Sequence, residues 1–567
     1  TQAAITTGTA RINQIYEREL SINLTLVNNT DIIFTNAATD PYTTANDNAQ
    51  VTENQAAIDT AVGNANYDVG HVLDTGGAGL AAGSSVCNAA QKAQGKSANS
   101  PHFGDALYVD YVAHEIGHQF GANHSYNTVT STCNTRNPST AYEPGSGSTI
   151  MAYANICGGG EDLQQLSDPN FHYVSLDEML TFTAPGTGGG DACAAKTASN
   201  ASDPTVSAGA NFTIPKSTPF ELTAVNGSDA ESPANQLTHS WEQYDLSANA
   251  QTLPQTAADT STGPLMRSFP PVFSPTRSFP RLSTVLGGAA ALGEILPAVA
   301  RELNFRVTIR DNAANGRIGT STMKLTVDGT SGPFHVTAPA QGANVDSTAN
   351  VVWDVAGTAA APVNAQNVDI SFSRDNGVTF APVMTTANDG METVNLTGAA
   401  SGANQARIKV KGSNNVFYNV SPAFTFAGGT HTVEFAVGAQ TRAENAGAVP
   451  VVVKLSAAST QDVTVQYSVA GSSTAVSPDD FSLTPANSIT IPAGQTQASI
   501  TANIVDDTLV EPTETVILTL SAPTNATLGA ITQHTLSITD NDSPPPPPKV
   551  EFVAAAQTQS ESAGAVP

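Results

Sequence analysis

The stretch YVAHEIGHQFGANHSYN, residues 111–127, holds three histidines whose spacing constrains the local fold. His114 and His118 are four residues apart, so on a helix they share a face, about 40° apart around the axis. His124 follows three residues after Gly121, and a straight helix would carry it to a different face. Glycine readily adopts the left-handed conformation that ends a helix, so Gly121 can turn the chain back. The spacing therefore predicts a helix that ends near Gly121 and a cluster of three imidazoles.

Three neutral imidazole nitrogens with a fourth position left open are the ligand set of a catalytic zinc ion, whereas structural zinc sites are closed. Glu115 follows the first histidine and can reach a water on such an ion without being a ligand itself. Two histidines at this spacing also occur by accident on exposed helices, so the third histidine beyond the glycine carries the specificity. The pattern predicts a zinc site with Glu115 as the general base.

The charge of the chain argues against nucleic acid as a partner. Its 567 residues carry 49 acidic and 22 basic side chains, a formal net charge of -27, and phosphate binding needs clustered Lys and Arg. An acidic surface suits a soluble secreted protein, and it either serves solubility alone or binds divalent cations through carboxylates. No run reaches the roughly 18 apolar residues of a membrane helix, so no membrane span is expected. Because the chain starts at Thr1 and not at Met, upstream sequence is expected.

All four cysteines lie in the first third of the chain, and none forms a C-x-x-C pair: Cys87, Cys133, Cys157 and Cys193. Four cysteines allow three pairings, between which the sequence does not choose. An even number confined to one segment indicates disulfides formed in an oxidising compartment. Buried free thiols are the alternative.

Residues 1–195 have the patterns of an α/β domain. Apolar residues recur at helical spacing in residues 10–20, on the face made by Ile12, Ile15, Tyr16 and Leu20. Gly63 is expected to end a second helix. The expected helices cover residues 10–20, 52–63 and 104–120, and the expected strands cover residues 21–27, 31–34 and 67–75.

Beyond residue 195, short Val, Ile, Thr and Phe runs alternate with Gly, Asn, Ser and Pro, which is typical of β-sandwich modules. We expect one module over residues 196–330 and a second over residues 331–428. Trp241 and Trp353 are expected in their cores rather than at ligand contacts. The Pro-rich stretch 266–283 is expected to be an irregular loop.

A third module, residues 429–542, opens on a sequence that recurs at the end of the chain. TVEFAVGAQTRAENAGAVP, residues 432–450, matches KVEFVAAAQTQSESAGAVP, residues 549–567. Residues 550–567 are therefore interpreted as the start of a second, truncated copy. Because one strand cannot bury a sandwich core, this copy should be unpaired or loosely docked. Residues 543–549, SPPPPPK, are expected to form a stiff polyproline II linker.

The full zinc-site pattern is H-E-x-x-H-x-x-G-x-x-H, residues 114–124, and a methionine follows in GSTIMAYANIC, residues 147–157. Over residues 5–195 the sequence resembles the metzincin zinc endopeptidases, and most closely their bacterial reprolysin-like, adamalysin-related branch. The resemblance implies a metzincin catalytic domain over residues 1–195. The first strand of the family's sheet is expected to precede Thr1, and its loss would expose part of the sheet.

The resemblance assigns a role to each residue of the motif. It implies that three imidazoles bind Zn²⁺, those of His114, His118 and His124. It implies that Glu115 takes a proton from the attacking water and passes it to the leaving amine, and that Met151 forms an apolar floor beneath the ligands. Tyr153 stands where astacins and serralysins carry a tyrosine close to the metal, so it is either a metal-proximal or oxyanion-stabilising residue or a packed tyrosine. Ser125 replaces the Asp that usually follows the third histidine in reprolysins, which weakens the subfamily assignment alone.

Two disulfides are also implied, Cys87–Cys193 and Cys133–Cys157. An extended substrate is expected to pair with an edge strand near residues 74–82. The histidines that lack the motif's spacing are expected to have structural roles: His71, His102 and His172.

Residues 429–542, from TVEFAVGAQTRAENAG through DDTLVEPTETVILTLS to HTLSITDND, resemble the Calx-beta domain. Such domains often bind Ca²⁺ at one end of the sandwich through clustered carboxylates. The matching positions are Glu444, Asp480, Asp506, Asp507, Glu511, Glu514, Asp540 and Asp542. The alternative is a Calx-beta domain with a structural role only. The two middle modules resemble PKD/Ig-like and fibronectin-like sandwiches, which serve as spacers or in adhesion.

The sequence thus predicts a multidomain protein, an α/β (α+β) metzincin catalytic domain followed by β-sandwich modules. We expect a secreted bacterial metalloendopeptidase, extracellular or at the cell surface, that hydrolyses peptide bonds of protein or peptide substrates through a zinc-activated water. Its β modules would contact extracellular matrix, cell surface or carbohydrate. The alternative is a surface adhesion protein built on a non-catalytic metzincin scaffold. The intact histidine trio and Glu115 favour the enzyme.

Overall fold

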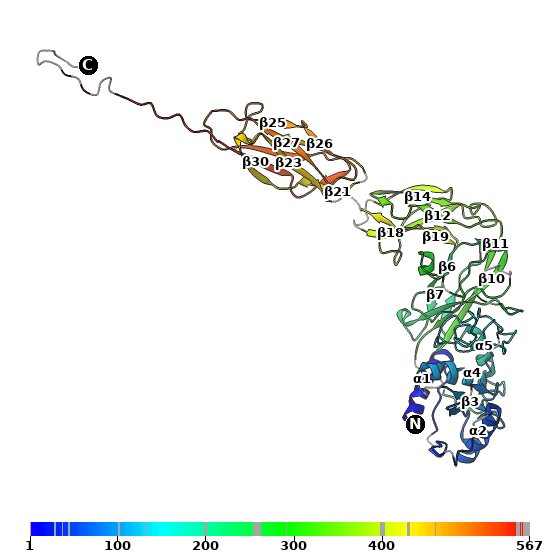
Figure 1. The fold of residues 1–567 in the computed structure, drawn as a ribbon. Coiled ribbons are helices and arrows are strands. Elements are labelled where there is room, and N and C mark those ends of the chain that lie inside the picture. The colour runs from blue at the N-terminus through cyan, green and yellow to red at the C-terminus, as the bar shows by residue number, and fades with distance from the viewer. Residues whose placement is uncertain are drawn as a thin grey trace. The chain divides into compact units, whose positions relative to one another are not determined.

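The chain forms two compact units in the computed structural model (Figure 1). The first unit comprises Thr1–Ala343, Asn350–Val394 and Asn404–Phe424, and the second comprises Asn344–Ala349, Asn395–Ala403 and Thr425–Pro567. The structure describes residues 2–551, 556 and 558, except residues 28–29, 37, 44–45, 77, 100–102, 131, 198–200, 252, 254–261, 291, 314, 397–402, 428–430, 457 and 460.

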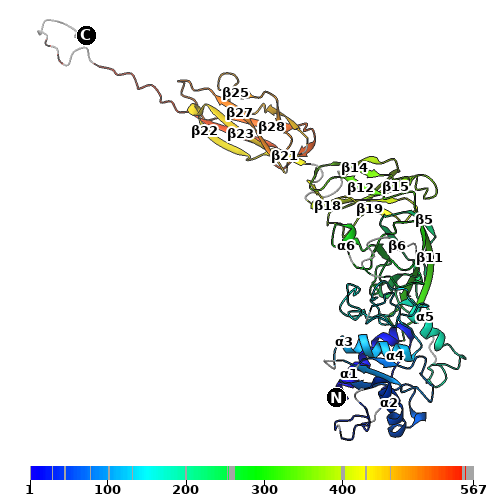
Figure 2. The same ribbon diagram turned by 45° about the vertical axis from the view of Figure 1, so that its right-hand side comes forward.

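Two long helices open the first unit, and both were expected. Helix α1 (Gln2–Leu20) buries the predicted apolar face, with Ile15 and Tyr16 fully inaccessible to solvent. Helix α2 (Asp47–Ala61) begins where the Asn46 side chain accepts a bond from Ala49 N at 3.2 Å, an N-cap, and ends before Gly63, whose φ is +87°. Figure 2 shows these helices beside the labels α3 and α4 at the N-terminal end.

The sheet of this region is small. Strand β1 (Val72–Asp74) runs parallel to β3 (Gly95–Ala98), and β2 (Leu80–Ala81) pairs antiparallel with the other side of β3. The strand expected at residues 67–75 is therefore present but shorter. One edge of β1 has no partner strand among the described residues, and β2 forms the opposite edge.

The strands expected at residues 21–27 and 31–34 are wrong, because the described residues there form no strand. A strand needs a neighbour to satisfy its backbone groups, and none is described beside them. The Asn13 side chain replaces a neighbouring strand at one residue only: it donates to Leu24 O at 2.8 Å and accepts from Leu24 N at 2.7 Å.

The helix expected over residues 104–120 is present, but its middle is wider than an α-helix. It runs as α3 (Asp105–Leu107), a π-helical segment η2 (Tyr108–Ala113) and α4 (His114–Gln119). The Tyr16 hydroxyl donates to the Ala113 carbonyl at 2.8 Å, so α1 holds the end of the π segment. Extra residues in a helical turn often occur next to functional groups, and here the first histidine of the motif comes directly after them.

The next region packs on the helical one through a buried ion pair. Its main sheet has the order β5 (Phe212–Pro215), β11 (Ile318–Asp328), β10 (Arg301–Arg310) and β8 (Thr238–Gln243). Arg310 on β10 donates twice to the Glu19 carboxylate on α1, at 2.8 Å each, and both side chains are fully buried. A bidentate pair with no solvent around it fixes the two elements against each other. The domain boundary at residues 195 and 196 stays a prediction.

The Pro-rich stretch 266–283 is less irregular than expected. Strand β9 (Thr276–Phe279) lies within it and pairs antiparallel with β6 (Phe220–Thr223). Trp241 and Trp353 are both buried in β-sheet regions, as expected. Their ring N–H groups donate to Pro275 O at 3.0 Å and to Asn388 Oδ1 at 2.8 Å.

Antiparallel strands dominate the remainder of the first unit. β15 (Asn367–Ser373) pairs with β16 (Ala381–Ala387) and β18 (Ala403–Gly412), while β12 (His335–Ala338) pairs with β14 (Thr348–Asp354). The multidomain architecture with β-sandwich modules that the sequence predicts is confirmed.

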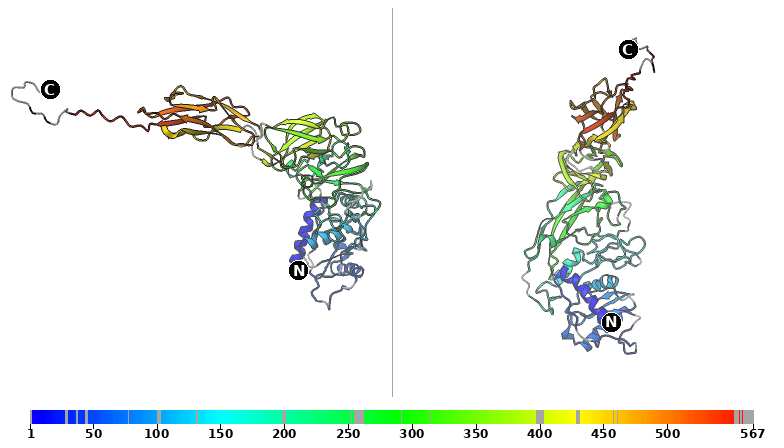
Figure 3. Two further views of the ribbon diagram at one scale, coloured as in Figure 1. Left: turned by 45° about the horizontal axis from the view of Figure 1, so that its top comes forward. Right: turned by 90° about the vertical axis from the view of Figure 1, so that its left-hand side faces the viewer.

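The second unit contains a sandwich of two five-stranded sheets, which the two views of Figure 3 show in yellow to orange. One sheet contains β25 (Phe481–Thr484), β27 (Gln497–Ile504), β23 (Ala448–Leu455), β21 (His431–Phe435) and β29 (Ala526–Leu528). The other contains β22 (Ala439–Ala443), β30 (Gln533–Thr539), β28 (Glu514–Ser521), β24 (Val463–Val469) and β26 (Ser488–Ile491). Alternate apolar residues of both sheets form its core.

The linker predicted at residues 543–549 contains no helix or strand. Most of the predicted second repeat lies outside the described residues, namely residues 552–555, 557 and 559–567. No helix among the described residues is long and apolar enough to cross a bilayer.

Candidate metal centre

Helix α4 and the turn after it position the three histidines. His114 and His118 lie on α4, which ends at Gln119, and Gly121 has a φ of +98°, in the left-handed region that favours glycine. The turn returns the chain, so that the ring centroid of His124 lies 4.7 Å from that of His118 and 5.3 Å from that of His114. The local prediction of a helix ended by Gly121 is confirmed.

Each imidazole is held at its Nδ1 atom by a backbone carbonyl. The three Nδ1 contacts are His114 to Ile150 O at 2.7 Å, His118 to Ala122 O at 2.7 Å and His124 to Thr135 O at 2.9 Å. A carbonyl oxygen can only accept, so the hydrogen of each neutral ring lies on Nδ1. Each Nε2 atom therefore presents a lone pair, which is the orientation that a metal ligand needs.

The Nε2 atoms converge on one another. Nε2 of His118 lies 3.1 Å from Nε2 of His124, and Nε2 of His114 is buried with no hydrogen-bond partner among the described residues. The ligand atoms of the three residues all lie within 4.8 Å of one another. Lone pairs this close repel unless a cation lies between them, so the cluster fits a divalent ion with a preference for imidazole, such as Zn²⁺.

Burial keeps these imidazoles neutral. Burial, and then the two neighbouring rings, holds the pKa of His114 well below its usual value. Burial, and then repulsion from His124, lowers the pKa of His118 to about 4. Burial also lowers the pKa of His124. Since the neutral imidazole is the form that binds metal, the folded protein presents its ligands in the competent state at neutral pH.

Glu115 lies beside the histidines, with 7% of its surface exposed. Burial raises the pKa of its carboxyl to about 8, and a cation bound by the imidazoles would lower that pKa again. A β-carbon built on Gly79 would lie 2.8 Å from Glu115 Cδ, so the glycine leaves the space that this carboxylate occupies. Gly79 directly precedes β2, the edge strand in the segment expected to pair with substrate.

Met151 is fully buried and packs against α4, the helix that carries His114 and His118. A β-carbon at Gly117, in the middle of α4, would collide with Met151 Sδ, so the bare glycine allows the sulfur to pack against the helix. The Tyr153 ring lies 4.6 Å from the His124 ring and stacks on Tyr126 at 4.7 Å, centroid to centroid. This position suits a role at the metal and equally suits packing.

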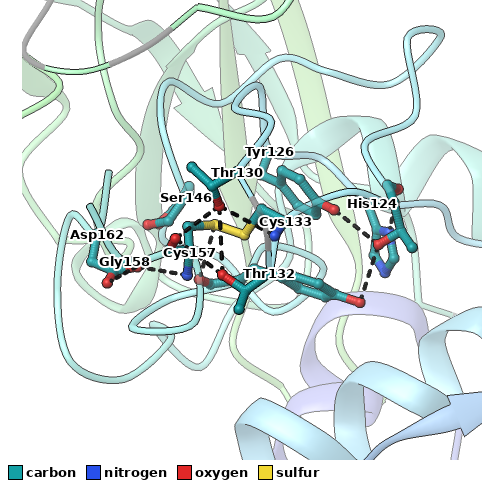
Figure 4. The surroundings of a disulfide bond; sticks show 12 residues. His124, Tyr126, Thr130, Thr132, Cys133, Ser146, Cys157, Gly158 and Asp162 are labelled. Atoms are coloured by element: carbon teal, nitrogen blue, oxygen red, sulfur yellow. Dashed lines mark hydrogen bonds between the residues drawn. A yellow bond between two sulfur atoms is a disulfide. The ribbon is translucent and has the colours of Figure 1, made fainter. Parts of the chain in front are cut away.

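Both pairs of cysteines form the disulfides that the resemblance implies, Cys87–Cys193 and Cys133–Cys157. Figure 4 shows the second of these: the hydroxyls of Thr130 and Thr132 both donate to Cys157 O, at 2.8 and 3.0 Å.

The Cys133–Cys157 bond closes a loop that carries two residues of interest for the histidine cluster. Thr135, whose carbonyl holds His124, follows its first cysteine, and Met151 precedes its second. Thr135 also donates through its hydroxyl to Tyr153 at 3.4 Å. The bond therefore ties the segment that supports the third histidine to the segment that carries Met151.

Two histidines outside the motif have structural partners, as expected. His71 contacts Gln119 Oε1 at 3.2 Å and Ser97 Oγ at 2.8 Å, and burial lowers its pKa to about 4. The His172 side chain accepts a bond from Val174 N at 3.2 Å, which caps the helix α5 (Tyr173–Phe182). His102 lies outside the described residues.

The carboxylates expected to bind calcium gather in two groups at one end of the second unit's sandwich. The groups are Glu444, Asp507 and Asp542, and Asp480, Glu511 and Glu514, with ligand atoms within 4.8 Å in each. Asp506 and Asp540 lie outside both groups, although Asp540 accepts a bond from Glu511 N at 3.2 Å. The sequence did not indicate this division, because the loops that carry the eight residues are far apart along the chain.

These carboxylates raise one another's pKa. Burial, followed by the hydrogen bond and charge of Asp480, raises the pKa of Glu514 to about 7. The pKa values of Glu511, Glu444 and Asp542 are also raised, by burial first and then by neighbouring carboxylates. Glu444 Oε2 and Asp542 Oδ2 are buried with no hydrogen-bond partner among the described residues. Oxygen donors with this repulsion fit a hard divalent cation such as Ca²⁺.

Comparison with known families gives two matches. Residues 2–125 match the metallo-peptidase family M12B, reprolysin-like, and residues 429–542 match the Calx-beta domain. The first match supports a metallopeptidase family for the N-terminal part, and it ends one residue after His124, so Met151 lies beyond it. The sandwich of the second unit is a Calx-beta domain.

Solved structures resemble this chain only distantly. The apo form of the Calx CBD1 domain is 23% identical, with a TM-score of 0.18, over 20% of this chain and 99% of that chain. The calcium-binding domain CBD12 of CALX1.1 is 24% identical, with a TM-score of 0.18, over 19% of this chain and 46% of that one. Chicken CNTN1 domains FN1–FN3 are 12% identical, with a TM-score of 0.18, over 60% of this chain and 99% of that one. Among curated proteins, no relative matches the chain.

Sequence reasoning missed the residues that support the histidines. The carbonyl partners of His114 and His124 belong to Ile150 and Thr135, which lie 36 and 11 residues away along the chain. A carbonyl leaves no trace in residue type, so no signal in the sequence could have identified them. The buried Glu143 carboxylate was also missed, because its neighbours in STAYEPGSG, residues 139–147, are typical of an exposed loop.

Proposed function

We propose that this chain is a secreted zinc-dependent endopeptidase that hydrolyses peptide bonds of protein substrates. The observation that carries the proposal is the arrangement of three neutral imidazoles, each fixed at Nδ1 by a carbonyl, with three Nε2 lone pairs converging beside a buried carboxylate. The match to an M12B peptidase family supports the same reaction class. The two disulfides are compatible with an oxidising, extracellular environment.

His114, His118 and His124 would hold the zinc ion through Nε2. Zinc bound there would supply Lewis acidity, which lowers the pKa of a coordinated water and polarises a peptide carbonyl. Glu115 accepts the proton of the attacking water and delivers it to the nitrogen of the departing amine. This carboxyl is shielded from solvent and lies on the same helix as two ligands. It can perform both proton transfers without moving, because the attacking water and the departing amine are both bound next to the metal.

Strand β2 supplies the surface for substrate. It forms the free edge of the sheet and lies next to Gly79, which abuts Glu115. An extended peptide that pairs with this edge would pass its backbone in front of the carboxylate. The rim position of Tyr153, 4.6 Å from the His124 ring, would let its hydroxyl donate to the oxyanion that forms on the scissile carbonyl.

The test is cleavage of casein or gelatin by the full chain, alongside measurement of bound zinc. We expect zinc-loaded protein to cleave, a chelator to abolish cleavage, and added zinc to restore it. Glu115→Ala should retain zinc and lose cleavage by about 10²- to 10⁴-fold, the usual contribution of a general base. A matched control is Glu302→Ala, which removes an exposed acidic residue on β10 that pairs with Lys324. Equal activity in the wild type and Glu115→Ala would refute the catalytic proposal, and zinc binding without cleavage by the wild type would favour an adhesive scaffold.

A second candidate function, calcium binding by the Calx-beta domain, follows from the two carboxylate groups and their unpartnered buried oxygens. We propose that the groups around Glu444 and Glu514 each bind Ca²⁺ and that the β modules space or anchor the peptidase. Titration calorimetry with Ca²⁺ tests the binding, with Mg²⁺ as the control ion. An absence of heat and of any rise in melting temperature with Ca²⁺ would leave the domain a structural role only.

A further inference from the structure

A fully buried carboxylate, that of Glu143, joins the two segments that support the histidines. It lies in the loop between the third histidine and Met151, and none of its surface is exposed. No Lys or Arg side chain forms an ion pair with it among the described residues. A buried acid outside any ion pair is costly unless hydrogen bonds satisfy it.

Donors from two segments surround the carboxylate. Ser125 Oγ donates to Oε1 at 2.7 Å, and the Thr149 hydroxyl also donates to Oε1. Ser148 N donates to Oε2 at 2.8 Å and Thr149 N donates to Oε2 at 3.2 Å. The Ser148 hydroxyl adds a longer bond of 3.4 Å. Ser148 N and Thr149 N can only donate, so Oε2 accepts from both, while the hydroxyls of Ser125 and Thr149 turn their hydrogens toward Oε1.

These donors are the immediate neighbours of the groups that hold the imidazoles. Ser125 follows His124, and Thr149 precedes Ile150, whose carbonyl accepts from His114 at 2.7 Å. Ser125 N also donates to Met151 O at 3.1 Å. The carboxylate thus fixes the segment carrying the third ligand against the segment that orients the first.

We propose that Glu143 is a positioning residue for the metal centre, acting through Ser125 on His124 and through Thr149 and Ile150 on His114. The inference rests on the proposed zinc site. It also gives Ser125 a role: at a position where reprolysins usually carry an acid, this chain has a hydroxyl that bonds to an acid contributed by a different part of the loop. Groups that orient metal ligands in this way typically change metal affinity or activity by about 10- to 100-fold when they are removed.

The experiment compares zinc affinity, measured by competition with a chromogenic chelator, in the full-length wild type, Glu143→Gln and Ser125→Ala. We expect Glu143→Gln to bind zinc about 10- to 100-fold more weakly, since a neutral amide loses the charge-assisted bonds that the carboxylate accepts from Ser125, Ser148 and Thr149. Ser125→Ala should have a smaller effect in the same direction, because the bonds to Ser148 and Thr149 remain. The double variant should bind no more weakly than Glu143→Gln, because both changes remove one shared bond.

A matched control is Glu161→Gln. Glu161 is another buried carboxylate, 3% exposed, in the segment that follows Met151, but its Oε1 accepts from Leu253 N at 2.7 Å. If a buried carboxylate near the Met151 segment mattered only for folding, this variant would behave like Glu143→Gln. We expect wild-type zinc affinity instead. If Glu143→Gln does not fold, as judged by circular dichroism, Ser125→Ala against Glu161→Gln decides.

Two readouts separate positioning from general stability. The visible spectrum of the Co²⁺-substituted protein reports ligand geometry, and it should change in Glu143→Gln and Ser125→Ala but not in Glu161→Gln. In the peptidase assay, kcat should fall while KM stays near the wild-type value, because the substrate edge is untouched. A Glu143→Gln protein with the zinc affinity and Co²⁺ spectrum of the wild type would overturn this inference alone. A wild type that takes up no zinc would overturn the proposed function.

Discussion

The histidine cluster and the carboxylate groups of the Calx-beta domain are both arranged to hold a cation, but they differ in what keeps the ligands in place. Every imidazole has one nitrogen bonded to a carbonyl and is neutral in the folded protein. The carboxylates instead lie close to one another, and burial followed by the neighbouring Asp480 raises the pKa of Glu514 to about 7. Buried oxygens of Glu444 and Asp542 have no hydrogen-bond partner among the described residues. Protein contacts hold the ligands of the first site, whereas the carboxylates of the second lack such contacts at their buried oxygens.

The two sites differ because imidazole ligands are neutral and carboxylate ligands are charged. Three neutral ligands can be buried and oriented in advance at little electrostatic cost, and the cost of three lone pairs facing each other is modest. Three anions cannot approach without strong repulsion, so a carboxylate site stays strained or partly protonated until a divalent cation arrives. Removal of the ion should therefore affect function at the first site and stability at the second.

The largest expected effect is the loss of hydrolysis in His118→Ala. Loss of a ligand removes several kcal/mol of transition-state stabilisation, which corresponds to about 10³-fold or more in rate. The control is His335→Ala, which alters an exposed histidine on β12. Cleavage rate and bound zinc should both fall in the first variant only. Hydrolysis that survives at the wild-type rate would mean that the cluster is not the reacting centre.

A related measurement tests whether the protein orients the three imidazoles before metal binds. In zinc-free protein, each of the three rings should carry its hydrogen on Nδ1, as detected by ¹⁵N chemical shifts. Rings that exchange between tautomers without metal would remove the distinction between the two regions.

The next effect in size concerns the space around the general base. Gly79→Ala would place a β-carbon against the Glu115 carboxylate, and a displacement of about 1 Å can cost about 10²-fold in rate. We expect kcat to fall by that order while zinc content stays at one ion per histidine site. Gly76→Ala is the control, since a β-carbon there meets nothing within 4 Å. Similar kcat values in both variants would show that Glu115 tolerates movement.

A smaller effect is expected when Ca²⁺ is added to the Calx-beta domain. At a concentration 100 times its Kd, calcium should raise the free energy of unfolding by about 2.7 kcal/mol, as measured by denaturant titration. Glu514→Gln should weaken that response, whereas Asp479→Asn, an exposed acid outside both groups, should not. A response equal in both variants would place the ion elsewhere.

The smallest effect is the pH dependence of the calcium-free domain. The pKa of Glu514 is about 7 in the folded protein against an ordinary value of 4.5, so the folded state binds more protons between these values. The free energy of unfolding should therefore decrease as pH rises from about 4.5 through about 7, and the contribution of Glu514 should be fully present only below about pH 4.5. Thermal melting across this range measures the trend, and Glu514→Gln should flatten it. An opposite slope would contradict the repulsion among the carboxylates.

The sequence anticipates those features that depend on neighbours a few residues apart. Four-residue spacing puts His114 and His118 on one helical face, and Gly121 allows the turn that returns His124. Short apolar runs between turn residues likewise predict the β-sandwich modules beyond residue 195, where β10, β15 and β18 lie. Where a strand depends on a partner, the prediction is weaker: residues 21–27 alternate correctly, yet without a described neighbour they form no strand.

The amino-acid sequence by itself determined the chemistry of this protein, because the types and local spacing of His114, Glu115, His118 and His124 restrict what they can bind. Only the tertiary structure decided how those ligands are held, through the Ile150 and Thr135 carbonyls and the Glu143 carboxylate, and which six of the eight calcium candidates form two groups. The reason is that side-chain type and helical periodicity act over a few residues, whereas hydrogen bonds between loops depend on the path of the whole chain.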